Sequence, residues 1–485
     1  MYTRKNDMEQ DVERAAVRFV CDLFERNRRL SEGPVIDQVD EEVLREVEAM
    51  GIPAEGRPLE DVVLDMEHDV IGYGYNCDHA RFMGMVPGPT SAVSWLGDMI
   101  ASGYNRHAGG VANYPAGCRA EQVLLRWLCD QAGFPQTATG VFTSGGSMAN
   151  MTASIAARDA RLPQDRWGDG VAYISEQTHS SAAKGLHMIG VPDARIRKIP
   201  VDEGMRMRVD ELERAITADE QAGLRPFLVI ATAGTTNTGA VDPLREIAGI
   251  CDAHDLWMHV DGAFGASVLL TRYRDMLDGI ELADSLTWDA HKWLFQTYSC
   301  GMVLVRDARD LLRSFATHPE YLKDLEESAA EDALINPWEL SPELTRPARG
   351  IKLWFTLQVM GSEGMARSIE HGFDLARWAE DELRRTPGAE VVTPAQMAMC
   401  TFRFCPDGLD AAALDELNQR VSQRMLASGY AGIFTTEIGG KKVLRICAIH
   451  PRTSEGEMRE VVRRLATLAD EEAAVMRGVQ VGTSR

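Results

Sequence analysis

The chain has 485 residues, of which 45% are hydrophobic and 26% are charged, and its formal net charge is -22 at pH 7. This length predicts two or three domains with ample buried surface. The acidic balance argues against a nucleic-acid-binding surface, because such a surface needs clustered lysine and arginine.

The nine cysteines occur singly, without a Cys-x-x-Cys pair or a Cys/His spacing. The pattern therefore predicts neither a disulfide framework nor a metal site. The first residues run into a charged stretch without the apolar core of a signal peptide, and no apolar run approaches membrane-spanning length. We expect a cytoplasmic protein with no nucleic-acid or membrane partner.

The first part of the chain predicts helices and one long loop. Apolar residues at helical spacing over residues 7–30 indicate an amphipathic helix, and a shorter helix is expected over residues 40–50. The turn-rich stretch 76–89 is a candidate binding wall, although a plain surface connection fits it equally well. Further helices are expected over residues 91–102 and 119–132.

The turn Gly145-Gly146-Ser147 precedes a helix expected over residues 148–160. Small residues at this point free the first backbone N–H groups of the helix to bind an anion. An ordinary helix cap has the same appearance, so the turn is informative only together with other residues.

From residue 170 to about residue 305, short β-like runs alternate with helical stretches, which predicts a doubly wound, mostly parallel sheet. We expect its strands over residues 171–174, 227–231, 256–260 and 285–288. Ligands of open α/β sheets bind at the carboxyl ends of the strands. A histidine, a carboxylate and a lysine follow these ends, as His179, Asp261 and Lys292.

Lys292 lies between His291 and Trp293, directly after the last of these strands. Apolar neighbours favour a partly desolvated amine, which is a better nucleophile than a solvated one. The alternative is a lysine that lies along a core strand with its head group in solvent.

The rest of the chain predicts a lid and a small domain. Residues 314–345 are too polar for a core and too long for a simple connection, so they indicate a mobile lid or a surface insertion without a role. Helices over residues 351–360 and 364–385 lead into a final segment that has the pattern of an α+β domain. Its expected strands lie near residues 390–392, 398–404 and 442–449, and its helices over residues 410–428 and 454–472.

One cofactor, pyridoxal phosphate, needs all these parts together: a lysine for its aldehyde, a carboxylate at its pyridine nitrogen and a backbone nest for its phosphate. Asp261 suits the pyridine nitrogen, because a carboxylate there keeps the nitrogen protonated. Ala263 is small enough to lie against the ring.

The sequence resembles the group II pyridoxal phosphate-dependent amino acid decarboxylases, which include the aromatic L-amino acid and glutamate decarboxylases. The resemblance extends from about residue 76 to residue 463. It rests on four runs: His179-Ser180-Ser181, Ala231-Thr232-Ala233-Gly234-Thr235-Thr236, His259-Val260-Asp261-Gly262-Ala263 and His291-Lys292-Trp293.

The resemblance implies the α/β architecture of fold type I and a homodimer with both active sites at the interface. An N-terminal helical extension that wraps the partner is expected over residues 1–95, the large domain over 96–358 and the small C-terminal domain over 359–485. In this family Lys292 would bind the cofactor covalently, Asp261 would pair with its pyridine nitrogen, and Ala263 and His179 would lie on opposite faces of its ring.

The resemblance also implies that Thr236 contacts the hydroxyl edge of the cofactor and that its phosphate is held by Gly145, Gly146, Ser147 and His291. Tyr321 falls where the family's mobile loop carries a tyrosine that returns a proton to the α-carbon after CO2 has left.

Substrate choice is expected to depend on Phe82, Met85, Val86, Gly88, His107 and Gly109. Several of these replace aromatic or apolar residues of the aromatic amino acid decarboxylases, which suggests a less aromatic and roomier pocket. An indole-sized side chain fits this description, and so does a long aliphatic or polar one. We expect decarboxylation of an L-amino acid to its amine, with tryptophan, tyrosine or phenylalanine favoured as the substrate.

Five alternatives remain at this point. Related aldehyde synthases lack the loop tyrosine or the stacking histidine, and both residues are retained here, which favours simple decarboxylation over aldehyde formation. A non-aromatic substrate or a carbon-carbon lyase reaction would use the same machinery. A dinucleotide-binding protein would need Gly-x-Gly-x-x-Gly after a first strand. A catalytically silent dimeric partner protein would not need Lys292 and Asp261.

Overall fold

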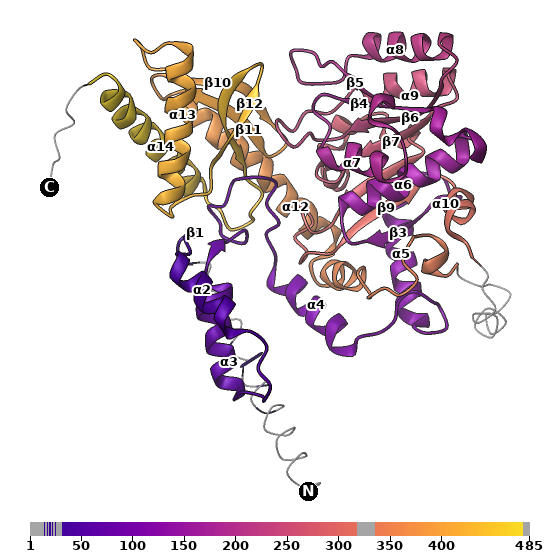
Figure 1. Ribbon diagram of the computed structural model, residues 1–485, viewed down its shortest axis with the longest axis horizontal. Coiled ribbons are helices and arrows are strands. Elements are labelled where there is room, and N and C mark those ends of the chain that lie inside the picture. The colour runs from indigo at the N-terminus through magenta and orange to yellow at the C-terminus, as the bar shows by residue number, and fades with distance from the viewer. Residues whose placement is uncertain are drawn as a thin grey trace, which may run out of the picture. The chain divides into compact units, whose positions relative to one another are not determined.

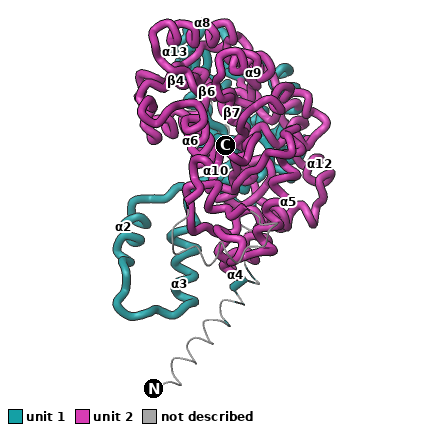
Figure 2. Tube along the Cα trace, turned by 90° about the vertical axis from the view of Figure 1, so that its right-hand side faces the viewer, with its two compact units in different colours: residues 1–87, 378–392, 402–485 teal, residues 88–377, 393–401 magenta. Residues whose placement is uncertain are grey.

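The computed structural model describes residues 32–317 and 335–478, together with residues 14, 17, 19, 20, 22 and 25. It forms two compact units (Figure 2). The first unit comprises residues 1–87, 378–392 and 402–485, and the second comprises residues 88–377 and 393–401. Most of the helix expected over residues 7–30 and the part of the expected lid that contains Tyr321 lie outside the described residues.

The second unit is built around a seven-stranded sheet with the order β3-β9-β8-β7-β6-β4-β5 (Figure 1). Its strands are β3 (Thr139–Thr143), β4 (Gly170–Ser175), β5 (Ile196–Ile199), β6 (Arg225–Thr232), β7 (Trp257–Asp261), β8 (Ser285–Asp289) and β9 (Gly301–Val305). All neighbours pair in parallel except β9, which is antiparallel to both β3 and β8. The expected mostly parallel sheet is therefore confirmed.

The four predicted strands correspond to β4, β6, β7 and β8. The sequence reasoning missed β3, β5 and β9, which carry glycine or charged residues that weaken a strand pattern. Because β3, β4, β6, β7 and β8 run in the same direction, their carboxyl ends meet at one edge of the sheet.

The first helices of the second unit are α4 and α5. Helix α6 comes next, with Gly145 of the predicted Gly-Gly-Ser turn as its N-cap and Gly146 and Ser147 in its first turn. The helices are α4 (Ala92–Tyr104), α5 (Pro115–Gln131), α6 (Gly146–Arg161), α7 (Ser180–Met188), α8 (Val209–Gln221), α9 (Leu244–Ala253) and α10 (Ala308–Phe315). The three helices predicted between residues 91 and 160 are confirmed, as α4, α5 and α6.

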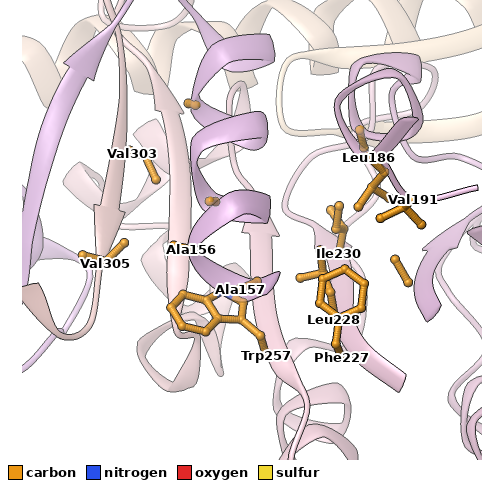
Figure 3. Close-up of a cluster of buried hydrophobic side chains, with 14 of the residues drawn as sticks. Ala156, Ala157, Leu186, Val191, Phe227, Leu228, Ile230, Trp257, Val303 and Val305 are labelled. Atoms are coloured by element: carbon orange, nitrogen blue, oxygen red, sulfur yellow. The ribbon is translucent and has the colours of Figure 1, made fainter. Parts of the chain in front are cut away.

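Helix α6 packs across the sheet, in contact with β3, β6, β7, β8 and β9. Four alanines on one helical face, Ala149, Ala153, Ala156 and Ala157, are fully buried. Small side chains let the helix approach the strands closely, and Figure 3 shows Ala156, Ala157 and Trp257 as members of one buried cluster. This packing holds the first turn of α6 at the carboxyl edge of the sheet.

Helix α12 (Ile351–Leu383) contains a residue with non-helical backbone, Gly361, at φ 69° and ψ 164°. Glycine adopts a positive φ without the steric cost that a Cβ imposes. The element therefore consists of two helices that meet at this glycine, as the sequence predicted.

A four-stranded sheet has the order β10-β11-β13-β12, and residues 393–401 of its first two strands are assigned to the second unit. The strands are β10 (Ala389–Gln396), β11 (Met399–Phe404), β12 (Phe434–Ile438) and β13 (Lys441–Cys447), and the helices are α13 (Ala411–Ala427) and α14 (Glu455–Met476). The expected α+β pattern is confirmed, although β12 was missed. Helix α13 packs on β12, β13 and α14.

The beginning of the first unit contains β1 (Ile36–Asp37), α2 (Glu41–Met50), α3 (Leu59–Asp65), the π-helical turn η1 (Met66–Ile71) and β2 (Gly74–Tyr75). Helix α2 was predicted, and Asp40 caps its first turn by accepting from two backbone N–H groups. Within the ranges that the structure describes, no helix is both long and apolar enough to span a bilayer.

Candidate active site

Lys292 lies in the turn that follows β8. Its Nζ is 3.2 Å from Oδ2 of Asp289, the last residue of the strand. The Lys292 side chain is 26% exposed and that of Asp289 only 2%. Oδ1 of Asp289 has no hydrogen-bond partner in the described part of the chain. The amine is therefore held against a buried carboxylate instead of extending freely into solvent.

Asp261 ends β7, the strand beside β8, and is buried. Its Oδ2 accepts a hydrogen bond from Asn150 Nδ2 at 2.8 Å, and its Oδ1 accepts one from the backbone N–H of Ala263 at 3.1 Å. Both oxygens thus act as acceptors, as the oxygens of an ionised carboxylate do. In the parallel pairing of the strands, Asp261 lies opposite Thr287, two residues before Asp289.

The first turn of α6 forms a narrow cradle beside these residues. A Cβ on Gly145 would lie 3.0 Å from His291 Cε1, and a Cβ on Gly146 would lie 2.8 Å from Asp289 Oδ2 and 3.2 Å from Ala263 Cβ. Only glycine lets the backbone approach this closely at Gly146. The N-cap residue, Gly145, has no side chain that could satisfy the first N–H groups, so they remain suited to bind an anion.

His291 is largely buried beside this cradle, with its Nε2 3.6 Å from Asp289 Oδ2. Burial lowers the pKa of His291, and the Asp289 carboxylate opposes that change only in part. The ring is therefore neutral near pH 7, and it can donate one hydrogen bond. Ser147, the next residue of the cradle, is exposed.

His179 and Thr236 follow β4 and β6 at the same edge. His179 is the N-cap of α7, and its Nδ1 accepts from the backbone N–H of Ser181 at 3.2 Å. The His179 side chain is exposed. Thr236 is half-buried in the turn after β6, which is closed by a bridge between Ala233 and Val241.

The predicted substrate residues divide between the two units. Phe82, Met85 and Val86 belong to the first, and Gly88, His107 and Gly109 belong to the second. Phe82 is buried within its own unit, where its ring lies edge-on to Phe434 at 6.2 Å. Met85 is exposed and has a positive φ of 50°.

At both glycines of this set, the neighbouring backbone leaves no room for a Cβ. A Cβ on Gly88 would lie 2.7 Å from the carbonyl oxygen of His291, and a Cβ on Gly109 would lie 2.2 Å from that of Leu344. The space left by their missing side chains is therefore taken by the chain itself. His107 Nδ1 is buried without a hydrogen-bond partner in the described structure, and its ring centroid lies 6.2 Å from that of Trp338.

Sequence reasoning gave no role to Asn150, Ser181, His259 or Asp289. The first two and Asp289 each contact a predicted site residue, and His259 contacts Asn150. His259 had a detectable signal, because it lies two residues before Asp261 and therefore on the same face of the strand. Asn150 had a weaker one, as a polar residue within an alanine-rich helical face.

These residues fit the cofactor expected from the sequence. An uncapped helix N-terminus suits a phosphate, an acceptor carboxylate suits a protonated ring nitrogen, and an amine lies at the end of the adjacent strand. No group of His, Cys, Asp or Glu suited to hold a metal ion occurs in residues 32–317 and 335–478.

Comparisons with known proteins agree with this geometry. Residues 42–405 match the family model of the pyridoxal-dependent decarboxylase conserved domain. The chain is 38% identical over 454 residues to an aromatic-L-amino-acid decarboxylase of Bacillus atrophaeus, with 93% of each protein covered. It is also 32% identical over 412 residues to an L-2,4-diaminobutyrate decarboxylase of Acinetobacter baumannii. This match covers 81% of this chain and 80% of the other protein.

Among solved structures, the chain is similar to the crystal structure of Oryza sativa TDC with PLP and tryptamine. The TM-score is 0.90 at 27% sequence identity, and the match covers 96% of this chain and 98% of the other. The expected fold type I is therefore confirmed. The chain belongs to the pyridoxal-dependent decarboxylase family, whose members are lyases that use pyridoxal phosphate to decarboxylate amino acids.

Proposed function

We propose that this enzyme converts an aromatic L-amino acid, such as tryptophan, tyrosine or phenylalanine, to its amine and CO2. One observation carries the proposal: the Lys292 amine, the Asp261 carboxylate and the uncapped start of α6 lie at one edge of the sheet. The aromatic preference is supported by the 38% identity to an aromatic-L-amino-acid decarboxylase over nearly the whole chain.

Each residue at this edge has its own role toward the cofactor. When bound, pyridoxal phosphate supplies an electron-accepting ring next to the substrate α-carbon. Asp261 would hold a proton on the ring nitrogen, because its oxygens are acceptors. Lys292 Nζ would hold the cofactor through its aldehyde. Gly145, Gly146, Ser147, His179, Thr236, Ala263 and His291 would hold its phosphate and its ring.

Proton return to the α-carbon is assigned to Tyr321 together with His179. Tyr321 lies outside the described residues, so this role rests on the resemblance to the family alone. The six substrate residues named from the sequence, Phe82, Met85, Val86, Gly88, His107 and Gly109, form part of the same proposal.

A homodimer is part of the proposal as well, with the N-terminal extension, residues 1–95, covering a second copy. Helices α2 and α3 contain no buried residue. Leu44, Leu64 and Ile71 in this stretch are exposed, and Ile52 is 98% exposed. So much apolar surface on one short segment marks an interaction site. We also propose a cytoplasmic location and the domain limits 96–358 and 359–485.

The decisive experiment is mass spectrometry of the products formed from a panel of L-amino acids by the purified, cofactor-loaded enzyme. Release of an amine from an aromatic member is the expected result. Aldehyde as the main product would contradict the assignment of Tyr321 and His179. The panel includes L-2,4-diaminobutyrate, because the 32% identity to its decarboxylase favours a non-aromatic substrate as the second candidate.

Covalent attachment is tested separately. Borohydride reduction should fix the cofactor to the wild-type protein and to Lys198→Ala, whose lysine is exposed on β5. Lys292→Ala should show no fixed cofactor by intact-protein mass. A fixed cofactor in Lys292→Ala would show that another amine binds the aldehyde.

A further inference from the structure

A chain of buried hydrogen bonds runs from β7 and β8 to the first half of α6. Trp257 Nε1 donates to Ser285 Oγ at 2.8 Å, and Ser285 Oγ lies 2.8 Å from His259 Nδ1. On the other side of the ring, His259 Nε2 lies 3.0 Å from Asn150 Oδ1. All four side chains are buried. We call Trp257, Ser285 and His259 the relay.

The direction of the relay follows from its first member. An indole N–H can only donate, so Ser285 Oγ accepts from Trp257 and has its own proton available for His259 Nδ1. Burial lowers the pKa of His259 to about 4, although the nearby Asp261 carboxylate opposes the change. A neutral ring that accepts at Nδ1 carries its one proton on Nε2.

The hydrogen bonds of Asn150, on the other side of the His259 ring, lead to the same tautomer. An ionised Asp261 only accepts, so Asn150 turns its Nδ2 toward Asp261 Oδ2 at 2.8 Å and its Oδ1 toward His259. Because an amide oxygen cannot donate, His259 Nε2 must do so. Thr287 Oγ1, at 3.3 Å from Nε2, can accept a share of the same proton.

A second branch reaches the other proposed catalytic side chain. Asn150 Nδ2 also donates to Ser181 Oγ at 3.3 Å. Ser181 Oγ lies 2.9 Å from His179 Nδ1, and the backbone N–H of Ser181 donates to the same nitrogen at 3.2 Å. A backbone N–H can only donate, so this nitrogen of His179 carries no proton. The proton of a neutral His179 is then on Nε2.

We propose that Asn150 is a positioning residue that holds Asp261 as an acceptor carboxylate and His179 in its Nε2-protonated form, and that the relay fixes the orientation of the Asn150 amide. The inference rests on the roles proposed above for Asp261 and His179. His179 thereby presents an N–H donor, not a lone pair, at its free ring nitrogen.

The start of the relay cannot easily reorient. Trp257 belongs to a buried hydrophobic cluster that also contains alanines of α6 and side chains of the sheet (Figure 3). Asn150 lies in the second turn of α6, the helix that the alanine face holds against the strands. Rotating the amide would place Oδ1 against Asp261 and Nδ2 against a ring nitrogen that donates, and both contacts would be repulsive.

The tautomers can be read directly by nitrogen NMR of the full-length protein labelled with 15N-histidine. His259→Gln and His179→Gln identify the two signals. We expect both rings at pH 7 to show a protonated Nε2 and an unprotonated Nδ1, with and without pyridoxal phosphate. A protonated Nδ1 on either ring, or rapid exchange between tautomers, would overturn the proposal.

Ser285→Ala tests the relay itself, and Ser267→Ala is its matched control. Trp288 Nε1 donates to Ser267 Oγ at 3.0 Å, and both serines are fully buried, so each variant orphans one indole N–H. Only Ser285→Ala interrupts the relay. We expect it to mix the His259 tautomers and to weaken the affinity of the apoprotein for pyridoxal phosphate about tenfold, the equivalent of one hydrogen bond.

Equal affinity losses in Ser285→Ala and Ser267→Ala would show that Ser285 is merely structural and would refute the relay. If either variant does not fold, the tautomers of His259 and His179 in the wild-type protein still test the proposal. Neither measurement uses a substrate. A protein with the expected tautomers that makes no amine would therefore refute the proposed function and leave this inference standing.

Discussion

Removing the charge of Glu121 should destabilise the second unit strongly, because this carboxylate neutralises a fully buried arginine. The side chains of Arg346 and Glu121 are 0% and 3% exposed. Arg346 donates to the two Glu121 oxygens at 2.9 and 3.2 Å, and Glu121 Oε1 also accepts from the backbone N–H of Gly350 at 2.9 Å. The pair thus joins α5 to the segment before α12.

Loss of one partner from a buried ion pair costs about 3–5 kcal/mol, because the remaining charge stays desolvated without compensation. Glu121→Gln keeps one oxygen as an acceptor, so we expect about 3 kcal/mol, the lower end of this range. Arg346 also donates to the carbonyl of Ala108 at 3.1 Å. This hydrogen bond remains in the variant and continues to stabilise the guanidinium charge in part.

The assay is equilibrium unfolding in urea at pH 7, with reversibility checked by refolding. The matched control is Glu363→Gln, which removes the same charge from an exposed pair with Arg367 at 3.8 Å, where Glu363 is 93% exposed. Exposed ion pairs contribute about 0–1 kcal/mol to the free energy of unfolding. A loss in Glu121→Gln no larger than that in Glu363→Gln would refute the reasoning that Arg346 depends on this carboxylate.

Three further predictions concern the site and the pH dependence. Gly146→Ala places a Cβ 2.8 Å from Asp289 Oδ2 and should weaken pyridoxal phosphate binding about tenfold or more in a fluorescence titration. Gly168→Ala, with open space around its Cβ, should not. Burial lowers the pKa of His450 to about 4, below its unfolded value, so its contribution to stability is lost as the pH falls. Between pH 7 and 5.5 this loss is about 1 kcal/mol in urea unfolding, so His450→Gln should lose about 1 kcal/mol less stability than the wild type over the same range. Tyr321→Phe should shift the product from amine toward aldehyde by mass spectrometry, and unchanged amine yield would remove Tyr321 from proton return.

The sequence alone predicted the α/β fold and the sheet edge at which the site lies. The strands that lead to Asp261 and Lys292 are short buried runs that end in turns, and these patterns depend on neighbours a few residues away. Because the carboxyl ends of parallel strands meet at one edge, local information was sufficient to bring these two residues together. Residue roles beyond that came from resemblance to a family.

The contacts that orient the site residues were decided only by tertiary structure. Asn150 donates to Asp261 across 111 residues of sequence, and Arg346 reaches Glu121 across 225. Gly109 is required by the carbonyl of Leu344, a neighbour that no local pattern indicates. Such partners are set by how α6 and the loops pack on the sheet, and packing depends on the shapes of surfaces that are far apart in the chain and come together only in the folded unit.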